Sequence, residues 1–192
     1  MTLYEMKQQL LSGKTIFDLS LRVVYYARVS TEKEEQINSL ENQVSFFENY
    51  IRKNTNWRFI RGYIDEGISG TTSLKREQFM QMIEDSQKDE FDLIVAKEVS
   101  RFSRDTIDSL YYTRKLLEYD VCVYFLSDNI VTASNDGELR LTIMSSMAQD
   151  EVRKISERTK FGFKRAVEKG TVLGTNNIWG YKKEKGKLII DE

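Results

Sequence analysis

The chain contains no histidine, no proline and only one cysteine among its 192 residues. Without histidine, the usual imidazole base and metal ligand are missing from any site that the chain builds. A single cysteine excludes a disulfide or a multi-cysteine zinc site within the chain. Cys122 lies in the apolar run 121–126, which favours a core residue over a nucleophile.

Long hydrophobic runs are also missing. No stretch approaches the length of a membrane span, and the N-terminus lacks the apolar region of a signal peptide. We therefore expect a cytoplasmic protein without a membrane partner. The hydrophobic content of 40% and the charged content of 31% are typical of a folded domain, and the length suffices for one α/β domain plus a tail.

Short β-like runs alternate with helical patterns along most of the chain. The runs that predict strands are rich in β-branched and aromatic residues and span 21–27, 58–64, 92–96 and 121–126. The helical patterns lie at 36–54, 75–87 and 105–119, with Asp105 as an expected N-cap. This alternation predicts a three-layer α/β fold with a mostly parallel sheet of four or five strands flanked by helices.

The sequence predicts four segments. Residues 1–20 form an N-terminal extension with a short helix that ends at Gly13. Residues 21–135 form the α/β domain, and residues 136–170 contain one long helix. Residues 171–192 are expected to be a linker and the opening of a further domain.

The long helical pattern runs from about Gly137 to Lys169, and Gly170 fits its C-terminal stop. At 1.5 Å per residue it is roughly 50 Å long. Its first half is apolar on more than one side, which indicates core packing or, as we favour, packing on a second subunit as well. The expected interface residues are Leu139, Ile143, Met144, Met147, Ala148 and Val152.

The second half of this helix is strongly basic. Seven basic residues stand against two acidic ones between 153 and 169, a local charge of +5, although the whole chain has a net charge of −1. The pattern fits either a solvated surface or a DNA contact, and the length of the helix favours DNA. The expected DNA-binding residues are Arg153, Lys154, Lys160, Lys164, Arg165 and Lys169.

A serine follows the first predicted strand, within the run Tyr26–Thr31. If the strand persists, Arg28 and Ser30 project to the same side. The carboxyl end of a strand is where open α/β sheets bind ligands, although this serine could instead cap the next helix or form a turn.

Two further polar segments follow the neighbouring strands. The run Ser100–Asp105 carries Arg101 and Arg104, three residues apart and therefore on one face of a helical turn. The glycine-containing run Asp65–Thr72 is typical of a mobile loop that covers a site, and Arg76 follows it. Each arginine could pair with a surface carboxylate, but together they predict one site at a single edge of the sheet.

Serine and several arginines, without histidine, suit phosphoryl transfer. The transition state of a phosphodiester spreads negative charge over oxygens that planar guanidinium groups bind in pairs. Arginines that supply the positive charge remove the need for a metal or a cofactor. The chain also lacks a glycine-lysine phosphate loop and a dinucleotide fingerprint, which argues against nucleotide hydrolysis.

In their order along the chain, these motifs resemble those of the serine recombinases, the resolvase–invertase group. The resemblance covers about residues 22–174 and includes 148–151 followed by 156–159 at the start of the basic half-helix. It implies a DNA recombinase that links Ser30 to a 5′ phosphate, exchanges strands and religates them without ATP. The implied partners are double-stranded DNA and further copies of the chain, as a dimer and, on paired sites, a tetramer.

The resemblance also implies residue roles. Ser30 is the nucleophile, and the residues that hold and neutralise the phosphate are Arg28, Arg101 and Arg104. The residues expected to support the site are Tyr26, Gln43, Asp65, Ser69, Arg76, Ser100, Glu157 and Arg158. The group that accepts the serine proton stays open between Asp65, a water molecule and an arginine.

One position departs from the small resolvases, where an aspartate usually precedes the first arginine of the motif. Here Ser100 takes that place, as in the large serine recombinases, and one carboxylate is lost from proton transfer. The tail 174–192 resembles the opening of the DNA-binding domain that follows in that subgroup. We therefore favour an integrase or transposase of a mobile element, such as a conjugative transposon, over a resolvase.

Two other functions compete with recombination. The first is a non-catalytic DNA-binding or dimerisation module that keeps the fold, and the intact serine–arginine set argues against it. The second is a phosphatase or nuclease that releases its covalent intermediate to water. A covalent adduct that is rejoined rather than hydrolysed would separate recombination from both.

Overall fold

A computed structural model describes residues 1–30, 37–67, 76–102, 106–171, 181–184 and 187–190. By internal contacts the chain divides into two compact units, Met1–Ser145 and Ser146–Glu192. The predicted boundaries at 20, 135 and 170 stay predictions, but the contacts place the N-terminal extension in the first unit. No helix in the described part is both long and apolar enough to cross a membrane.

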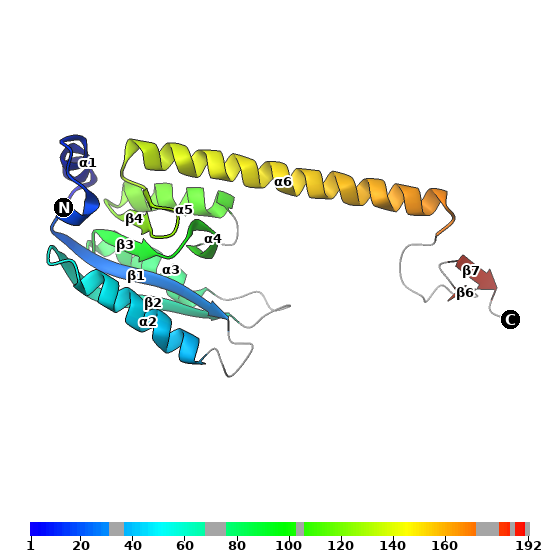
Figure 1. The fold of residues 1–192 in the computed structure, drawn as a ribbon, viewed down its shortest axis with the longest axis horizontal. Helices are drawn as coiled ribbons and strands as arrows, with labels where there is room; N and C mark the ends of the chain where they lie inside the picture. The colour runs from blue at the N-terminus through cyan, green and yellow to red at the C-terminus, as the bar shows by residue number, and fades with distance from the viewer. Residues whose placement is uncertain (31–36, 68–75, 103–105, 172–180, 185–186, 191–192) are drawn as a thin grey trace. The chain divides into compact units, whose positions relative to one another are not determined.

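The first unit is built on a five-stranded sheet with the order β2-β1-β3-β4-β5 (Figure 1). The strands are β1 (Leu21–Ser30), β2 (Trp57–Gly67), β3 (Leu93–Ala96), β4 (Cys122–Phe125) and β5 (Ile130–Val131). The first four run parallel, and β5 is antiparallel to β4. All residues of β3 and β4 are buried, as expected of strands covered on both faces, and the predicted α/β fold is confirmed.

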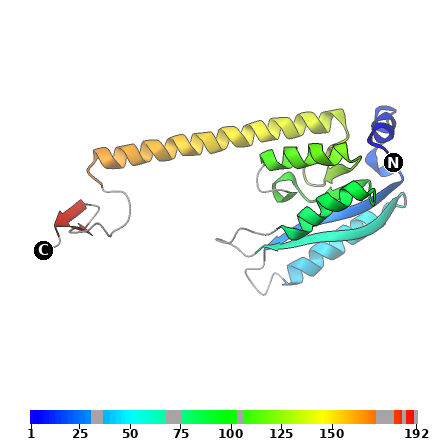
Figure 2. The ribbon, with the colours of Figure 1, turned by 180° about the vertical axis from the view of Figure 1, so that it is seen from behind.

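Helices cover both faces of this sheet (Figures 1 and 2). They are α2 (Ile37–Arg52), α3 (Glu77–Asp85), α4 (Val99–Phe102) and α5 (Thr106–Glu118), with the short turn η3 (Ser86–Lys88) after α3. Phe47 and Ile51 of α2 pack in one core cluster with alternate residues of β1. Phe79 of α3, Phe102 of α4 and Leu116 of α5 pack in the other. The core is therefore two apolar layers separated by the sheet.

The N-terminal extension contains the predicted helix, α1 (Leu3–Leu11), followed by η1 (Ile16–Asp18). Thr2 and Glu5 form a capping box at its start, and Gly13, with φ of 93°, follows its end. Met6 is fully buried in the cluster that contains Phe47. Phe17 stacks on the Trp57 ring with 5.4 Å between centroids. These contacts attach the N-terminal extension to the core of the first unit.

Asp92, just before β3, accepts several hydrogen bonds, including two from charged groups. Its carboxylate accepts hydrogen bonds from the terminal ammonium of Met1 at 2.8 Å and from the Arg22 backbone at 2.7 Å and side chain at 2.9 Å. Burial alone would raise the pKa of Asp92, but the bonds from Arg22 and the ammonium outweigh it and lower that pKa. The carboxylate therefore stays charged and joins the extension to the sheet.

Gly62 of β2 lies against an aromatic stack. A Cβ atom at this position would lie 2.1 Å from the Tyr25 ring. Tyr25 stacks between Phe47 and Phe59, at centroid distances of 5.0 and 6.0 Å. The absence of a side chain at Gly62 thus allows β2 to approach the ring.

The predicted long helix is α6 (Asn135–Glu168), which begins two residues before Gly137. Its end is a Schellman motif: the Gly170 N–H donates to the Val167 carbonyl and the Thr171 N–H to the Ala166 carbonyl. Gly170 has φ of 75°, as the sequence predicted for a terminating glycine. Beyond it, β6 (Tyr181–Glu184) and β7 (Lys187–Ile190) form an antiparallel pair.

Candidate phosphate-binding site

A pocket opens at the carboxyl ends of β1 and β3. These two strands lie side by side, but the helices that follow them in sequence, α2 and α4, pack on opposite faces of the sheet. Such a reversal of strand order is where open α/β sheets bind ligands. The residues that line the pocket are Tyr26, Ala27, Arg28, Gln43, Phe47, Ala96, Lys97 and Arg101.

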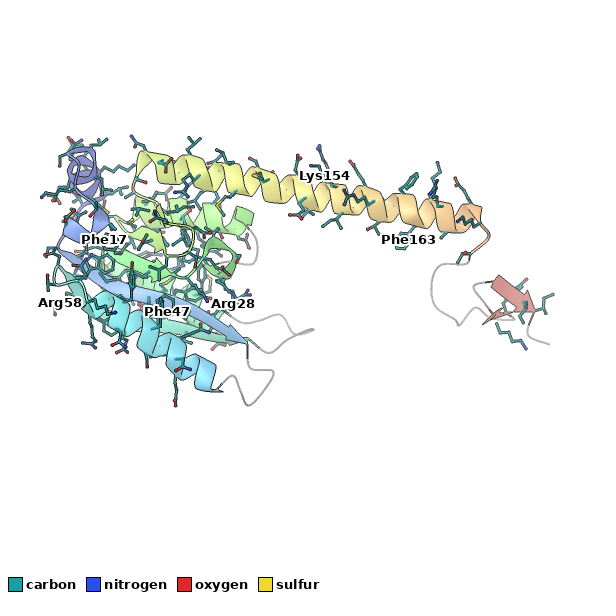
Figure 3. The ribbon with its side chains drawn as sticks, in the orientation of Figure 1. Phe17, Arg28, Phe47, Arg58, Lys154 and Phe163 are labelled. Atoms are coloured by element: carbon teal, nitrogen blue, oxygen red, sulfur yellow. The ribbon has the colours of Figure 1, made fainter. Side chains whose placement is uncertain are left out.

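The pocket has a cationic lining. Arg28, Lys97 and Arg101 contribute three basic side chains, and no carboxylate is among its described lining residues. Two guanidinium groups and an ammonium suit a phosphate, because they offer several charged donors to oxygens that share one charge. Figure 3 places Arg28 at the carboxyl end of β1, with Arg58 at the opposite end of the sheet. Three of the residues expected at the site, Arg28, Gln43 and Arg101, line this one pocket.

Ser30 is the last residue of β1, two residues beyond Arg28. Its backbone pairs in parallel register with Gly67 of β2, so the strand does persist through the motif. The Ser30 side chain lies outside the described residues, as do Ser69 and Arg104. Their expected places at the site stay predictions.

Arg101 sits on α4, a four-residue helix that is held from several directions. The Val99 N–H donates to Asp128 Oδ2 at 2.8 Å, and the Val99 carbonyl accepts from Ser109 Oγ at 3.2 Å. The Phe102 carbonyl accepts a hydrogen bond from the Arg76 guanidinium. Because Val99 and Phe102 are also buried in the core, the backbone around Arg101 is firmly placed.

Next to the pocket, Tyr26, Asp65 and Arg76 form a buried network. The Tyr26 hydroxyl donates to Asp65 Oδ2 at 3.0 Å and accepts from Arg76 Nη2 at 3.0 Å. The Arg76 guanidinium carbon also lies 3.9 Å from the centre of the Phe79 ring. Burial raises the pKa of Tyr26 to about 12, so the hydroxyl stays neutral and serves both partners. The network joins β1, β2, α3 and α4.

Asp65 has a different setting from the one that the sequence predicted. We expected β2 to end at residue 64 and Asp65 to begin a loop, but β2 continues to Gly67 and Asp65 is only 5% exposed. Its carboxylate accepts hydrogen bonds from the backbone N–H groups of Gln78 and Phe79, each at 3.0 Å. It therefore caps the N-terminus of α3, where a negative charge is favourable.

The residues expected on the long helix divide between the two units. Glu157 and Arg158 are exposed and lie in the second unit, so their expected support of the site stays a prediction. The predicted basic residues of 153–169 are all exposed. Lys154 and Phe163 point to opposite sides of α6 (Figure 3).

The expected interface residues of α6 are mostly exposed. Leu139, Ile143, Met147 and Val152 have 50 to 68% of their surface accessible. Met144 instead packs partly against the core of the first unit. The Ala148 side chain lies outside the described residues.

Sequence reasoning did not find Lys97, Glu98 or Asp128. Lys97 lines the pocket, Glu98 contacts Arg101, and Asp128 holds the start of α4. Lys97 and Glu98 lie directly after the predicted strand 92–96 and before the arginine motif, which was the available signal. Asp128 bonds to α4 across 29 residues of sequence, and no local pattern reveals such a contact.

Cys122 is fully buried, and burial raises the pKa of its thiol to about 11. A thiol with this pKa is protonated at neutral pH and does not act as a nucleophile, in agreement with the sequence interpretation. Within the ranges that the structure describes, no group of three or more cysteine or carboxylate residues could hold a metal ion.

Fold and pocket together describe a mostly parallel α/β domain with a pocket at its strand reversal that is lined by three basic side chains. Residues 23–172 match the family model described as "Resolvase, N terminal domain". The chain belongs to the resolvase family.

Three relatives illustrate the match. The R46 site-specific recombinase of Escherichia coli is 31% identical over 82% of this chain and 76% of its own length. A resolvase of Clostridium perfringens is 34% identical over 77% of this chain and 73% of its own. A crystal structure of a resolvase family site-specific recombinase from Streptococcus pneumoniae aligns with a TM-score of 0.60 and 28% identity, covering 77% of this chain and 99% of that one.

Proposed function

We propose that this chain is the catalytic domain of a site-specific DNA recombinase that uses Ser30 as its nucleophile. The observation that carries the proposal is the pocket lined by Arg28, Lys97 and Arg101, which lies at the end of the strand that Ser30 terminates. Membership of the resolvase family supports the same reaction.

In the proposed step, the Ser30 hydroxyl oxygen attacks the phosphorus of a DNA phosphodiester. A bond forms between the serine oxygen and the 5′ phosphate, and the bond from phosphorus to the 3′ oxygen breaks. The serine hydroxyl loses its proton, and the leaving 3′ oxygen gains a proton to become a hydroxyl. Arg28, Lys97 and Arg101 stabilise the charge that develops on the non-bridging oxygens. Because the phosphoserine ester conserves the energy of the broken diester, religation proceeds in reverse without ATP.

Asp65 is an unsuitable proton acceptor in this arrangement. Its oxygens already accept hydrogen bonds from Tyr26 and from the start of α3, and the residue is buried. We therefore favour a water molecule or the leaving oxygen as the acceptor. The residues expected to complete the site, Arg104 and Arg158 among them, keep that role in the proposal.

Capture of the covalent intermediate tests the proposed reaction. The wild-type chain is incubated with a pool of short random-sequence duplexes and denatured, and any protein–DNA adduct is sequenced and its protein site mapped by mass spectrometry. We expect a 5′-phosphoserine at Ser30 and a free 3′ hydroxyl, and rejoining of the duplex when the adduct is left native. Absence of an adduct would favour a non-catalytic module, and release to water would favour a nuclease.

The proposed partner is double-stranded DNA, contacted by the basic half of α6. Seven basic side chains lie exposed on this half-helix, and the Arg165 guanidinium lies 5.1 Å from the Phe161 ring centre. Exposed cations on a helix neutralise phosphates and release their counterions. The proposed localisation, for a chain that acts on DNA, is the cytoplasm.

Removal of Lys160, Lys164 and Arg165 by alanine substitution should weaken DNA binding and flatten its salt dependence. Three lost phosphate contacts reduce the slope of log affinity against log salt by about 2 to 3. Fluorescence anisotropy at several salt concentrations measures the slope. The matched control removes Lys14, Lys53 and Arg58, which are exposed residues of the first unit, and should leave the slope unchanged. Equal slopes for the two triple variants would count against α6 as the DNA contact.

We also propose self-association through α6, as a dimer and as a tetramer on paired DNA sites. Leu139, Ile143 and Met147 recur every four residues and so lie along one side of the helix. Each exposes at least half of its surface, and such exposed apolar rows usually mark an interface. Ser100 in place of an aspartate, and the strand pair that follows α6, favour the integrase or transposase type within the family.

A further inference from the structure

Glu98 contacts the arginine motif at the edge of the pocket. Its Oε1 atom accepts a hydrogen bond from Ser100 Oγ at 2.8 Å and another from Arg101 Nε at 3.3 Å. Glu98 lies between β3 and α4, and it is not among the described residues that line the pocket. One carboxylate oxygen of Glu98 thus accepts hydrogen bonds from both Ser100 and Arg101, while Glu98 itself does not line the pocket.

The Arg101 atom used in this contact decides what the guanidinium offers to a ligand. An arginine bound through Nε keeps its two terminal nitrogens, which form the fork that matches two oxygens of a phosphate. The bond to Glu98 also restricts rotation of the planar group. A carboxylate at this place therefore selects one orientation of Arg101 and leaves its phosphate-binding side available.

The backbone of α4 cannot provide this orientation alone. Val99 and Phe102 are fixed by Asp128, Ser109 and Arg76, but the Arg101 side chain is 53% exposed and has several rotatable bonds. A long exposed side chain samples many rotamers unless a partner selects one. Among the described residues, Glu98 is the carboxylate that pairs with Arg101.

Glu98 is charged under ordinary conditions. The hydrogen bond from Ser100, together with the bond from Arg101, lowers its pKa from the usual value. Because Glu98 is about one third exposed, an ion pair of this kind contributes little to folding stability. Its effect is therefore expected on the geometry of Arg101 rather than on the stability of the domain.

We propose that Glu98 is a positioning residue that orients Arg101 toward the phosphate. The inference rests on the proposed function, because it assigns Glu98 a role in that same cleavage step. The Ser100 hydroxyl helps to hold the Glu98 carboxylate beside Arg101.

The test compares E98Q and E98D with the wild type on the duplex that the wild type cleaves. The rate of adduct formation at saturating protein should fall by about 10-fold or more in E98Q, because a misplaced catalytic group costs rate. E98D keeps the charge on a shorter side chain and should recover part of the loss. The dissociation constant for DNA should stay within about 2-fold of the wild type, because the lost contact is made to Arg101 and not to DNA.

E138Q is the matched control, because Glu138 forms an exposed pair with Arg114 at 3.2 Å and neither residue lines the pocket. It should cleave at the wild-type rate. The Nε–H resonance of Arg101, assigned from its loss in R101K, should move in E98Q and stay in E138Q. The unfolding temperature should be the same for the wild type, E98Q and E138Q.

The outcomes separate this inference from the proposed function. A wild type that forms no adduct rejects the proposed function itself. A wild type that forms the adduct, with E98Q cleaving at the same rate, rejects the role of Glu98 alone. A slow E98Q whose rate E98D does not improve, or whose Arg101 resonance is unchanged, rejects action through the charge on Arg101.

Discussion

Replacement of Ser30 by alanine is expected to lower the rate of DNA strand cleavage by at least about 10⁴-fold, the scale seen when an enzyme loses its nucleophile. The pocket beside the end of β1 supplies positive charge through Arg28, Lys97 and Arg101, but in the proposed reaction these groups hold the phosphate and do not attack it. Without the hydroxyl, the phosphate is held and not attacked. Denaturing gels of labelled duplex measure the loss as the disappearance of the protein–DNA adduct.

Two controls make this result specific to the hydroxyl. Ser20 is an exposed serine just before β1, and Ser20→Ala should form the adduct at the wild-type rate. Ser30→Ala should bind DNA with wild-type affinity, because the basic side chains of the pocket and of α6 are intact. Continued cleavage with the same ends in Ser30→Ala would place the nucleophile elsewhere.

Replacement of Asp65 by alanine is expected to lower the free energy of unfolding by about 3 to 5 kcal/mol, because several hydrogen-bonding groups in and near the core lose their acceptor at once. The substitution leaves the Tyr26 hydroxyl without its acceptor and the N–H groups of Gln78 and Phe79 without their cap. It also leaves the Arg76 guanidinium near Tyr26 without a nearby buried carboxylate. Each uncompensated polar group in the core adds to the loss.

Urea denaturation followed by circular dichroism measures this free energy. Asp65→Asn is the graded comparison, because its amide keeps one acceptor oxygen for the cap and should lose less than Asp65→Ala. For a domain of this size, a loss of 3 kcal/mol corresponds to a fall in unfolding temperature of about 6 to 12 °C. If Asp65→Ala were as stable as the wild type and yet unable to cleave, Asp65 would belong to proton transfer and not to the fold.

Much of the α/β fold follows from local sequence patterns. The β-branched runs at 92–96 and 121–126 predict strands buried on both faces, and β3 and β4 lie there with every residue buried. Gly170 predicts the end of α6 because a left-handed residue is needed after the last turn, and it has a positive φ. Such features are set within a few residues, so a single sequence is enough to find them.

Other features depend on contacts between distant segments. The two-residue strand β5 is too short to leave a periodic pattern, and it exists because it pairs with β4. Asp65 is polar and followed by glycines, which indicated a loop. Its burial becomes favourable only because the start of α3 and the Tyr26 hydroxyl satisfy its oxygens. Those partners are 14 and 39 residues away.

Part of the candidate site could also be predicted from the sequence. Arg28 and Arg101 follow strands that a reader can predict, and parallel neighbours bring their carboxyl ends together. Lys97 and Glu98 have the same position in sequence, directly after β3, but opposite charges. Only the folded chain separates their roles, because the Lys97 side chain enters the pocket lining and that of Glu98 meets Arg101.

The absence of a side chain at Gly62 limits which substitutions this domain can accept. An edge strand normally tolerates substitutions better than the other strands of a sheet, because side chains there contact few neighbours. Here even the methyl group of alanine would press on Tyr25, and Tyr25 stacks on Phe47, a neighbour of Gln43 in the pocket wall. Libraries that vary β2 should therefore hold position 62 constant, because changes at the sheet's margin would be transmitted to the chemistry through two aromatic rings.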